Sequence, residues 1–170
     1  MRWLACVLVL AAGCAAEQPA KVCPWLTLGT ASRLLGAAAT VRVQVAEDGT
    51  GSCVFLAAPK SAMHAAAEVN TAASLTLTVA AHAQPSCGRD AKALSGVGNQ
   101  AQECGLQGKS RRESEAAVRI VGQVRDRWFV LDAVGLPESS ERNPPARWAD
   151  EAGLPTPLER AAEQVAGNLY

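Results

Sequence analysis

The sequence has almost no net charge and few aromatic residues, and both shortages narrow what the protein can be. Its 170 residues carry 16 basic and 16 acidic side chains, so the formal net charge is zero. A chain without excess positive charge lacks the field that attracts nucleic acid, and we exclude nucleic-acid binding. Aromatic residues make up only 4% of a chain that is 49% hydrophobic. The core should therefore consist of valine, leucine and alanine with a few tryptophan and phenylalanine anchors.

An apolar run near the start of the chain is too short to cross a membrane. It extends over ten residues, Trp3–Ala12, whereas a bilayer needs about 20. Arg2 precedes the run, which ends with the small residue Ala12 and is followed by Gly13. A positive start, a short apolar core and small residues are the order of a secretion signal, which we predict over residues 1–13.

The end of this signal, "LAAGC", resembles a bacterial lipobox, although Ala11 stands where leucine is usual. The resemblance implies that the chain is cut before Cys14, whose thiol takes a diacylglycerol and whose new amine is often acylated, for example with palmitate. Two or more acyl chains anchor a protein stably, so we expect membrane attachment at the cell envelope. Ala15 favours the outer membrane if the cell has two. Residues 14–22 would form a tether. The alternative is an ordinary signal peptide, with Cys14 an incidental residue near the cut.

The remaining cysteines predict disulfides. Cys6 leaves with the signal, and an even number stays in an exported chain. These cysteines are Cys23, Cys53, Cys87 and Cys104. Four cysteines allow three connectivities, and we favour the sequential pairs, which close loops of roughly 30 and 18 residues. Metal binding is the alternative, but the chain has no C-x-x-C, and neither His64 nor His82 stands at zinc-ligand spacing from a cysteine. We therefore expect no metal and no cofactor.

Two periodicities organise the rest of the chain. Alternating apolar and polar residues predict strands over residues 40–48, 52–58, 74–82, 96–106 (after a glycine turn), 116–124 and 127–134. Apolar residues at three-and-four spacing, or alanine-rich composition, predict helices over residues 27–36, 60–73, 88–96, 146–153 and 157–170. The last two strands are apolar on both faces, which is typical of the centre of a sheet. This order predicts an α+β fold, an antiparallel sheet of about five to six strands packed with helices as a two-layer sandwich. We place the domain at 23–136, a linker at 137–145 and C-terminal helices at 146–170.

This layout resembles small bacterial lipoproteins of unknown function. The resemblance covers roughly residues 23–135 and is carried by three segments: "CPWLTLGTASRLLGAA…GTGSCVF", "LSGVGNQAQEC" and "VRIVGQVRDRWFVLDAV". It implies a disulfide between Cys23 and Cys53 and a location in the envelope. It implies no catalytic residue, because these proteins have no clear activity. Cys87 and Cys104 lie outside the shared pattern.

Catalytic motifs are missing from the sequence. A serine nucleophile on a tight turn needs G-x-S-x-G, and "GTGSC" and "LSGVG" both depart from it. His64 and Glu68 stand four residues apart in an expected helix, where an exposed contact is a simpler interpretation than an acid–base pair. Asp132 lies in an apolar strand, and we expect a structural ion pair with Arg119 or Arg125. We therefore predict no catalytic residue.

These observations favour a membrane-anchored, non-catalytic binding or interaction module of the envelope. Its partner would be an envelope protein or a small apolar ligand. The alternative is an envelope hydrolase, which a cleft joining His64 or His82 to a serine and a carboxylate would favour.

The hairpin of residues 116–134 supplies a candidate partner surface. Its second strand presents Trp128, Val130 and Val134 on one face, and Phe129, Leu131 and Ala133 on the other. Terminal helices carrying Trp148, Leu158, Val165 and Leu169 can cover only one of these faces. The uncovered face would then remain apolar and bind a partner, unless the first two helices close it.

Overall fold

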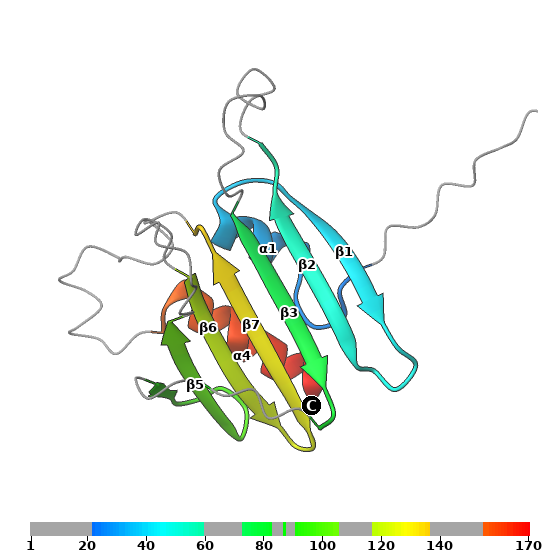
Figure 1. Cartoon of the computed structure of the whole chain (residues 1–170), viewed down its shortest axis with the longest axis vertical. Coiled ribbons are helices and arrows are strands. Elements are labelled where there is room, and N and C mark those ends of the chain that lie inside the picture. The colour runs from blue at the N-terminus through cyan, green and yellow to red at the C-terminus, as the bar shows by residue number, and fades with distance from the viewer. Residues whose placement is uncertain (1–21, 60–72, 83–86, 88–90, 106–116, 137–154) are drawn as a thin grey trace, which may run out of the picture.

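An antiparallel sheet of seven strands forms the framework of the protein (Figure 1). The computed structural model describes residues 22–59, 73–82, 87, 91–105, 117–136 and 155–170. The strands are β1 (Ala39–Val45), β2 (Gly51–Ala57), β3 (Ser74–Ala80), β4 (Lys92–Leu94), β5 (Gln100–Gly105), β6 (Ala117–Val124) and β7 (Arg127–Val134). The helices are α1 (Leu28–Leu35) and α4 (Pro157–Leu169). Neighbouring strands follow the order β1-β2-β3-β7-β6-β5-β4.

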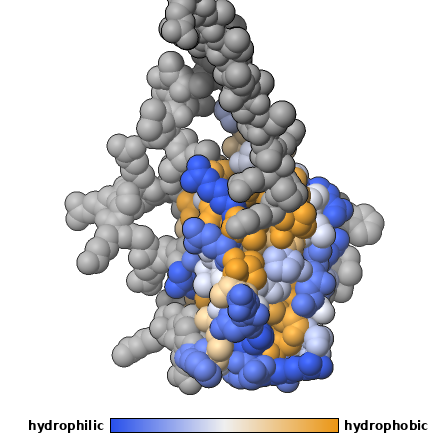
Figure 2. All heavy atoms as spheres, turned by 90° about the vertical axis from the view of Figure 1, so that its right-hand side faces the viewer, coloured by the Kyte–Doolittle hydropathy of each residue, from blue (hydrophilic) through white to orange (hydrophobic). Residues whose placement is uncertain are grey.

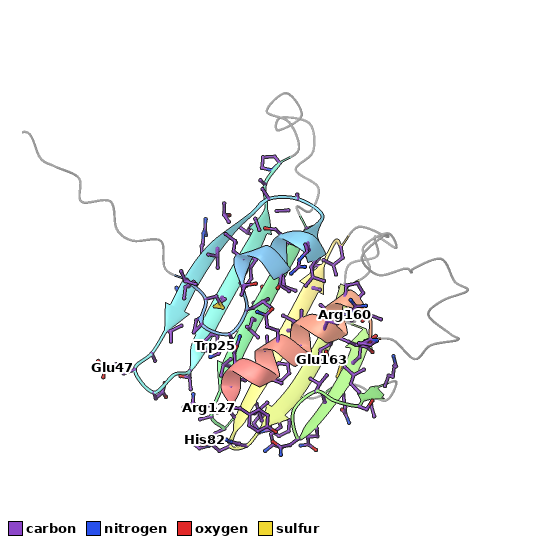
Figure 3. The ribbon with its side chains drawn as sticks, turned by 180° about the vertical axis from the view of Figure 1, so that it is seen from behind. Trp25, Glu47, His82, Arg127, Arg160 and Glu163 are labelled. Carbon is purple, nitrogen blue, oxygen red and sulfur yellow. A yellow bond between two sulfur atoms is a disulfide. The ribbon has the colours of Figure 1, made fainter. Side chains whose placement is uncertain are left out.

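Both helices pack on the same side of the sheet (Figure 3). α1 lies over β1 and β2, and α4 lies over β6 and β7. The Thr30 hydroxyl donates to Gln164 Oε1 at 2.8 Å, which joins the two helices. The Asn168 amide donates to the Trp25 carbonyl at 2.9 Å. The described residues therefore form two layers around one core, as the α+β prediction requires, and α4 belongs to that core. We call the covered side the helix side and the other side the open face.

The ends of both helices follow from their local sequence. The Thr27 hydroxyl accepts from the Thr30 backbone N–H, and Gly36 ends α1 in the left-handed conformation at φ 64°. α4 begins with a capping box, in which Thr156 and Glu159 each bind the other's backbone N–H. The predictions of helices over 27–36 and 157–170 are confirmed.

Small and branched side chains fill the core. The buried face of α4 consists of Leu158, Ala161, Ala162, Val165 and Ala166. The sheet side chains that face the helices and are fully buried include Phe55, Leu75, Leu77, Ile120, Phe129 and Leu131. Because alanine has only a methyl group, such a face lets a helix approach a sheet closely. The core is of the aliphatic type that the composition predicts.

The β6–β7 hairpin lies inside the sheet, between β5 and β3, as its two apolar faces predict. Its two-residue turn contains Arg125 at φ 55°. Gly122 stands opposite Phe129 in the register, and a Cβ atom on Gly122 would lie 2.3 Å from the Phe129 ring. The glycine therefore makes the space that the phenylalanine occupies.

Two expectations need correction. The helix expected over residues 88–96 is wrong, because Lys92–Leu94 form strand β4 and pair with residues 101–103 of β5. This added strand also raises the count from the expected five or six to seven. A three-residue strand is too short to show a period of two, and cross-strand pairing overrides the local helical preference.

Several sequence predictions lie outside the described residues. They concern the signal and Cys14, the helix over 60–73 with His64 and Glu68, the linker 137–145, and the helix with Trp148.

Candidate functional site

The open face carries a mixture of apolar, aromatic and polar side chains. Trp128, Val130 and Val134 point to it from β7, whereas Phe129, Leu131 and Ala133 face the helices and are at most 1% exposed. This division is the predicted one. The neighbours on the open face are Val54 and Leu56 of β2, Thr76 and Thr78 of β3, and Arg119, Val121 and Gln123 of β6. Most of them are half-buried, Thr78 is exposed and Val121 is buried.

An ion pair stands in the middle of this face. Arg119 and Asp132 are direct cross-strand partners on β6 and β7. The guanidinium Nε and Nη2 donate to the two carboxylate oxygens at 2.6 and 2.9 Å. The hydrogen bonds that Arg119 donates to Asp132 raise the pKa of the guanidinium, which stays charged at any physiological pH. Of the two partners expected for Asp132, the structure selects Arg119.

The pair is only partly shielded from water. The Arg119 and Asp132 side chains are 31% and 24% exposed. An ion pair at this depth contributes modestly to stability, and each group keeps hydrogen-bonding capacity for an incoming partner. The two charges thus give this mixed face a fixed charged centre.

The two disulfides lie on opposite sides of the sheet. Cys23 is joined to Cys53, which points to the helix side beside Phe55. Cys87 is joined to Cys104, which lies opposite Arg119 in the register and therefore on the open face. These are the sequential pairs that the sequence favours. The second bond fixes Cys87, which lies between β3 and β4 in the sequence, to the open face of β5.

No protein-family model, curated protein or solved structure matches this chain.

A second charged group, on the helix side, was not predicted from the sequence. The Lys92 Nζ atom lies 3.2 Å from Glu159 Oε1. Lys92 also stands opposite Glu103 in the register of β4 and β5. Burial raises the pKa of Glu103, and the nearby Glu159 raises it further against the effect of Lys92. Burial would also raise the pKa of Glu159, but hydrogen bonds from Thr156 and Lys92 outweigh it and lower that pKa.

This group links the start of α4 to the edge of the sheet. Glu159 is the third residue of the helix, so its carboxylate caps α4 and reaches β4 at the same time. The signal in the sequence is the T-x-x-E spacing at residues 156–159, which is typical of a capping box. Its link to Lys92 depends on strand β4, which was not predicted.

The remaining candidate residues are not brought together in the described part of the chain. His82 is exposed just beyond the end of β3. Within the described ranges, no three His, Cys, Asp or Glu side chains are grouped to hold a metal ion. No helix in that part is long and apolar enough to cross a membrane.

Proposed function

We propose that the protein is a lipid-anchored protein of the bacterial cell envelope that works as a non-catalytic binding module. Its anchor would be the acylated Cys14, and its binding surface the open face of the sheet. The partner would be another envelope protein. The anchor rests on the sequence order of a positive charge, a short apolar run and small residues before Cys14.

The observation that supports the binding role is the placement of the helices. α1 and α4 both lie on the helix side, and neither lies over the open face of the sheet (Figure 1). That face carries Trp128, Val130 and Thr78. Protein interfaces are enriched in tryptophan and arginine, and their energy concentrates on such residues where a polar rim surrounds them. The open face offers Trp128 and Arg119 among valines, threonines and glutamines.

A protein partner suits this surface better than a small apolar ligand. Small molecules bind in concave sites that enclose most of their area. The open face is the outer surface of a sheet, and β-branched side chains such as Val130 and Thr78 stand side by side on neighbouring strands. A second protein surface can cover such a face and exclude water from its apolar residues.

The described residues give the hydrolase alternative no support. The cleft that would favour it joins a histidine, a serine and a carboxylate. His82 is exposed and His64 lies outside the described residues, so this alternative stays a prediction from the sequence.

The anchor is tested by removing its attachment site. Cys14→Ala should release the protein from membranes, because no acyl chain can then form. Intact-mass measurement of the membrane-extracted protein should show a diacylglyceryl addition on a chain that starts at Cys14. An unmodified chain that is cut elsewhere contradicts the anchor.

The binding surface is tested by cross-linking in the cell. A photo-reactive residue at Thr78, exposed on the open face, should form an adduct of protein mass, whereas one at Arg160, exposed on α4, should not. Val130→Lys should abolish the adduct while leaving thermal melting nearly unchanged. Leu131→Lys is the matched control, and it should unfold the protein because Leu131 is fully buried. If Val130→Lys also unfolds the protein, Val130 belongs to the core and the proposed surface is wrong.

A further inference from the structure

The two outer strands of the sheet differ in how they are protected. β4 is three residues long, and Lys92 on it is bound to Glu159. β1 is seven residues long, contains no proline, and pairs with β2 without interruption from Ala39 to Val45. Edge strands are usually shortened, bulged or interrupted by proline, because a long regular edge pairs readily with another strand. β1 lacks these protections.

The outward-facing backbone groups of β1 can be assigned from the ladder. The Ala46 N–H donates to the Thr50 carbonyl, and the Ala58 N–H donates to the Ala38 carbonyl. Because hydrogen-bonded pairs alternate in an antiparallel ladder, the even-numbered residues of β1 face β2 and the odd-numbered ones face outward. The outward N–H of Ala39 is bound by the Ser32 hydroxyl.

Three residues thus present backbone groups that the described residues do not pair: Val41, Val43 and Val45. Their N–H and C=O groups form a regular row along the edge of the sheet. Such a row binds an added strand through main-chain hydrogen bonds.

Apolar side chains lie along the same edge. Val41, Val43 and Val45 face the helix side, and Val45 is 43% exposed. Val22 is 78% exposed and precedes Cys23, whose disulfide partner Cys53 stands opposite Val43. Figure 2 looks onto the β1 side and shows apolar surface there, bordered by hydrophilic residues. Exposed apolar residues next to unpaired backbone favour an occupant that covers both.

We propose that this occupant is a second copy of the chain, paired β1 to β1 in antiparallel orientation about a two-fold axis through Val43. Val41 would then stand opposite Val45 of the second copy, and Val43 opposite Val43. Every outward N–H and C=O of these three valines finds a partner in this register. The seven strands of each copy join into one continuous sheet, with all helices on the same side.

The one charged residue of β1, Arg42, selects this register. With the axis at Val43, Arg42 of each copy stands opposite Gln44 of the other copy. No two like charges are then opposite each other. An axis at Arg42 would place two arginines directly opposite each other, which is unfavourable. An axis at Val41 would pair Val43 with Ala39 of the second copy. The Ala39 N–H already donates to the Ser32 hydroxyl, so it could not donate to Val43. The edge is therefore most complementary to itself about Val43.

The first test is a cross-link that only this register allows. Arg42 and Gln44 of the second copy would form a non-hydrogen-bonded pair with Cα atoms about 4.5 Å apart, which a disulfide can bridge. Full-length Arg42→Cys and Gln44→Cys chains should give a cross-linked dimer when they are co-expressed in the envelope. Each variant alone should not, because identical positions lie about 7–8 Å apart on the diagonal. Equal cross-linking of either variant with itself would overturn the register.

The second test changes the dimer without changing the monomer fold. Gln44→Glu places a carboxylate opposite Arg42 twice and should tighten the dimer about 2- to 30-fold, whereas Gln44→Arg should weaken it by a similar factor. Val43→Pro removes an outward N–H and leaves the ladder to β2 intact, so it should give a monomer. Light scattering of the full-length chain over a concentration series measures the mass, and thermal melting monitors the fold.

Two outcomes would overturn the proposal. One is a wild-type chain that stays monomeric throughout the series. The other is a dimer that Gln44→Arg and Val43→Pro leave unchanged, which would place the contact elsewhere. Neither outcome bears on the open face, because the Thr78 cross-link and Val130→Lys report on that face separately.

Discussion

Gly122 shows how a single missing side chain shapes the core. It lies on β6 between Ala101 of β5 and Phe129 of β7, and the Phe129 ring occupies the volume that a Cβ atom at Gly122 would need. Phe129 is fully buried on the helix side of β7. The position of this ring therefore depends on glycine at 122.

We expect Gly122→Ala to destabilise the protein by about 1–3 kcal/mol, because the added methyl group would lie 2.3 Å from ring atoms that have little space to move. Gly29→Ala is the matched control. Gly29 lies in α1 with no atom within 4 Å of an added Cβ, so alanine there should stabilise by about 0.4–1 kcal/mol. Urea unfolding measures both. Equal effects of the two changes would show that the Phe129 ring does not limit position 122.

At the scale of elements, the contact between α4 and the β4–β5 edge should make stability depend on pH. The lowered pKa of Glu159 means that its charge stabilises the fold above the unfolded value of 4.5, and this contribution is lost as the pH falls through the lower folded pKa. The raised pKa of Glu103 has the opposite sign, so ionisation of Glu103 opposes folding as the pH rises above 4.5.

Glutamine variants separate these two contributions. Glu159→Gln should lower the urea midpoint at pH 7, and Glu103→Gln should raise it, because the first removes a stabilising charge and the second a destabilising one. Both differences from wild type should disappear in acid, where the two carboxyl groups are protonated. Urea titrations at several pH values measure this. A Glu103→Gln variant less stable than wild type at pH 7 would contradict the burial of its charge.

The local elements were predictable to the extent that a short stretch of sequence encodes them. Alternation over "TVRVQV" and "SLTLTV" predicts β1 and β3. Thr27 or Thr30 as N-cap and Gly36 as C-cap predict the ends of α1, and the structure selects Thr27. Strand β4 was missed, because Lys92–Leu94 are a strand only through their pairing with β5.

The arrangement of the elements was harder to predict. β3 pairs with β7, although 46 residues, 81–126, separate the two strands in the sequence. No local pattern encodes such a contact. Alternation showed that Trp128 and Phe129 face opposite ways, but only the packing of α1 and α4 shows which face is open. The unprotected edge of β1 could not be recognised either, because it depends on the order of strands in the sheet.

The whole molecule is held by two cross-links placed far from each other. Cys53 lies on β2 and faces the helices, whereas Cys104 lies on β5 and faces the open side. β3, β7 and β6 stand between these strands, which puts them about 19 Å apart at the usual strand spacing. The disulfides share no neighbouring strand, so each should stabilise the fold independently of the other.

This independence predicts additive losses. Replacing Cys23 and Cys53 by alanine, or Cys87 and Cys104, should each cost about 3–4 kcal/mol, because each bond closes a loop of 17 or 30 residues in the unfolded chain. The fourfold variant should lose the sum to within about 0.5 kcal/mol. That loss approaches the total stability of a typical domain, about 5–15 kcal/mol, so the variant without disulfides should be largely unfolded at 37 °C.

Urea unfolding of the three variants measures the sum, and non-reducing peptide mapping of the wild type verifies both bonds. A mapped link between Cys23 and Cys104, or a fourfold variant as stable as either twofold one, would contradict two independent cross-links.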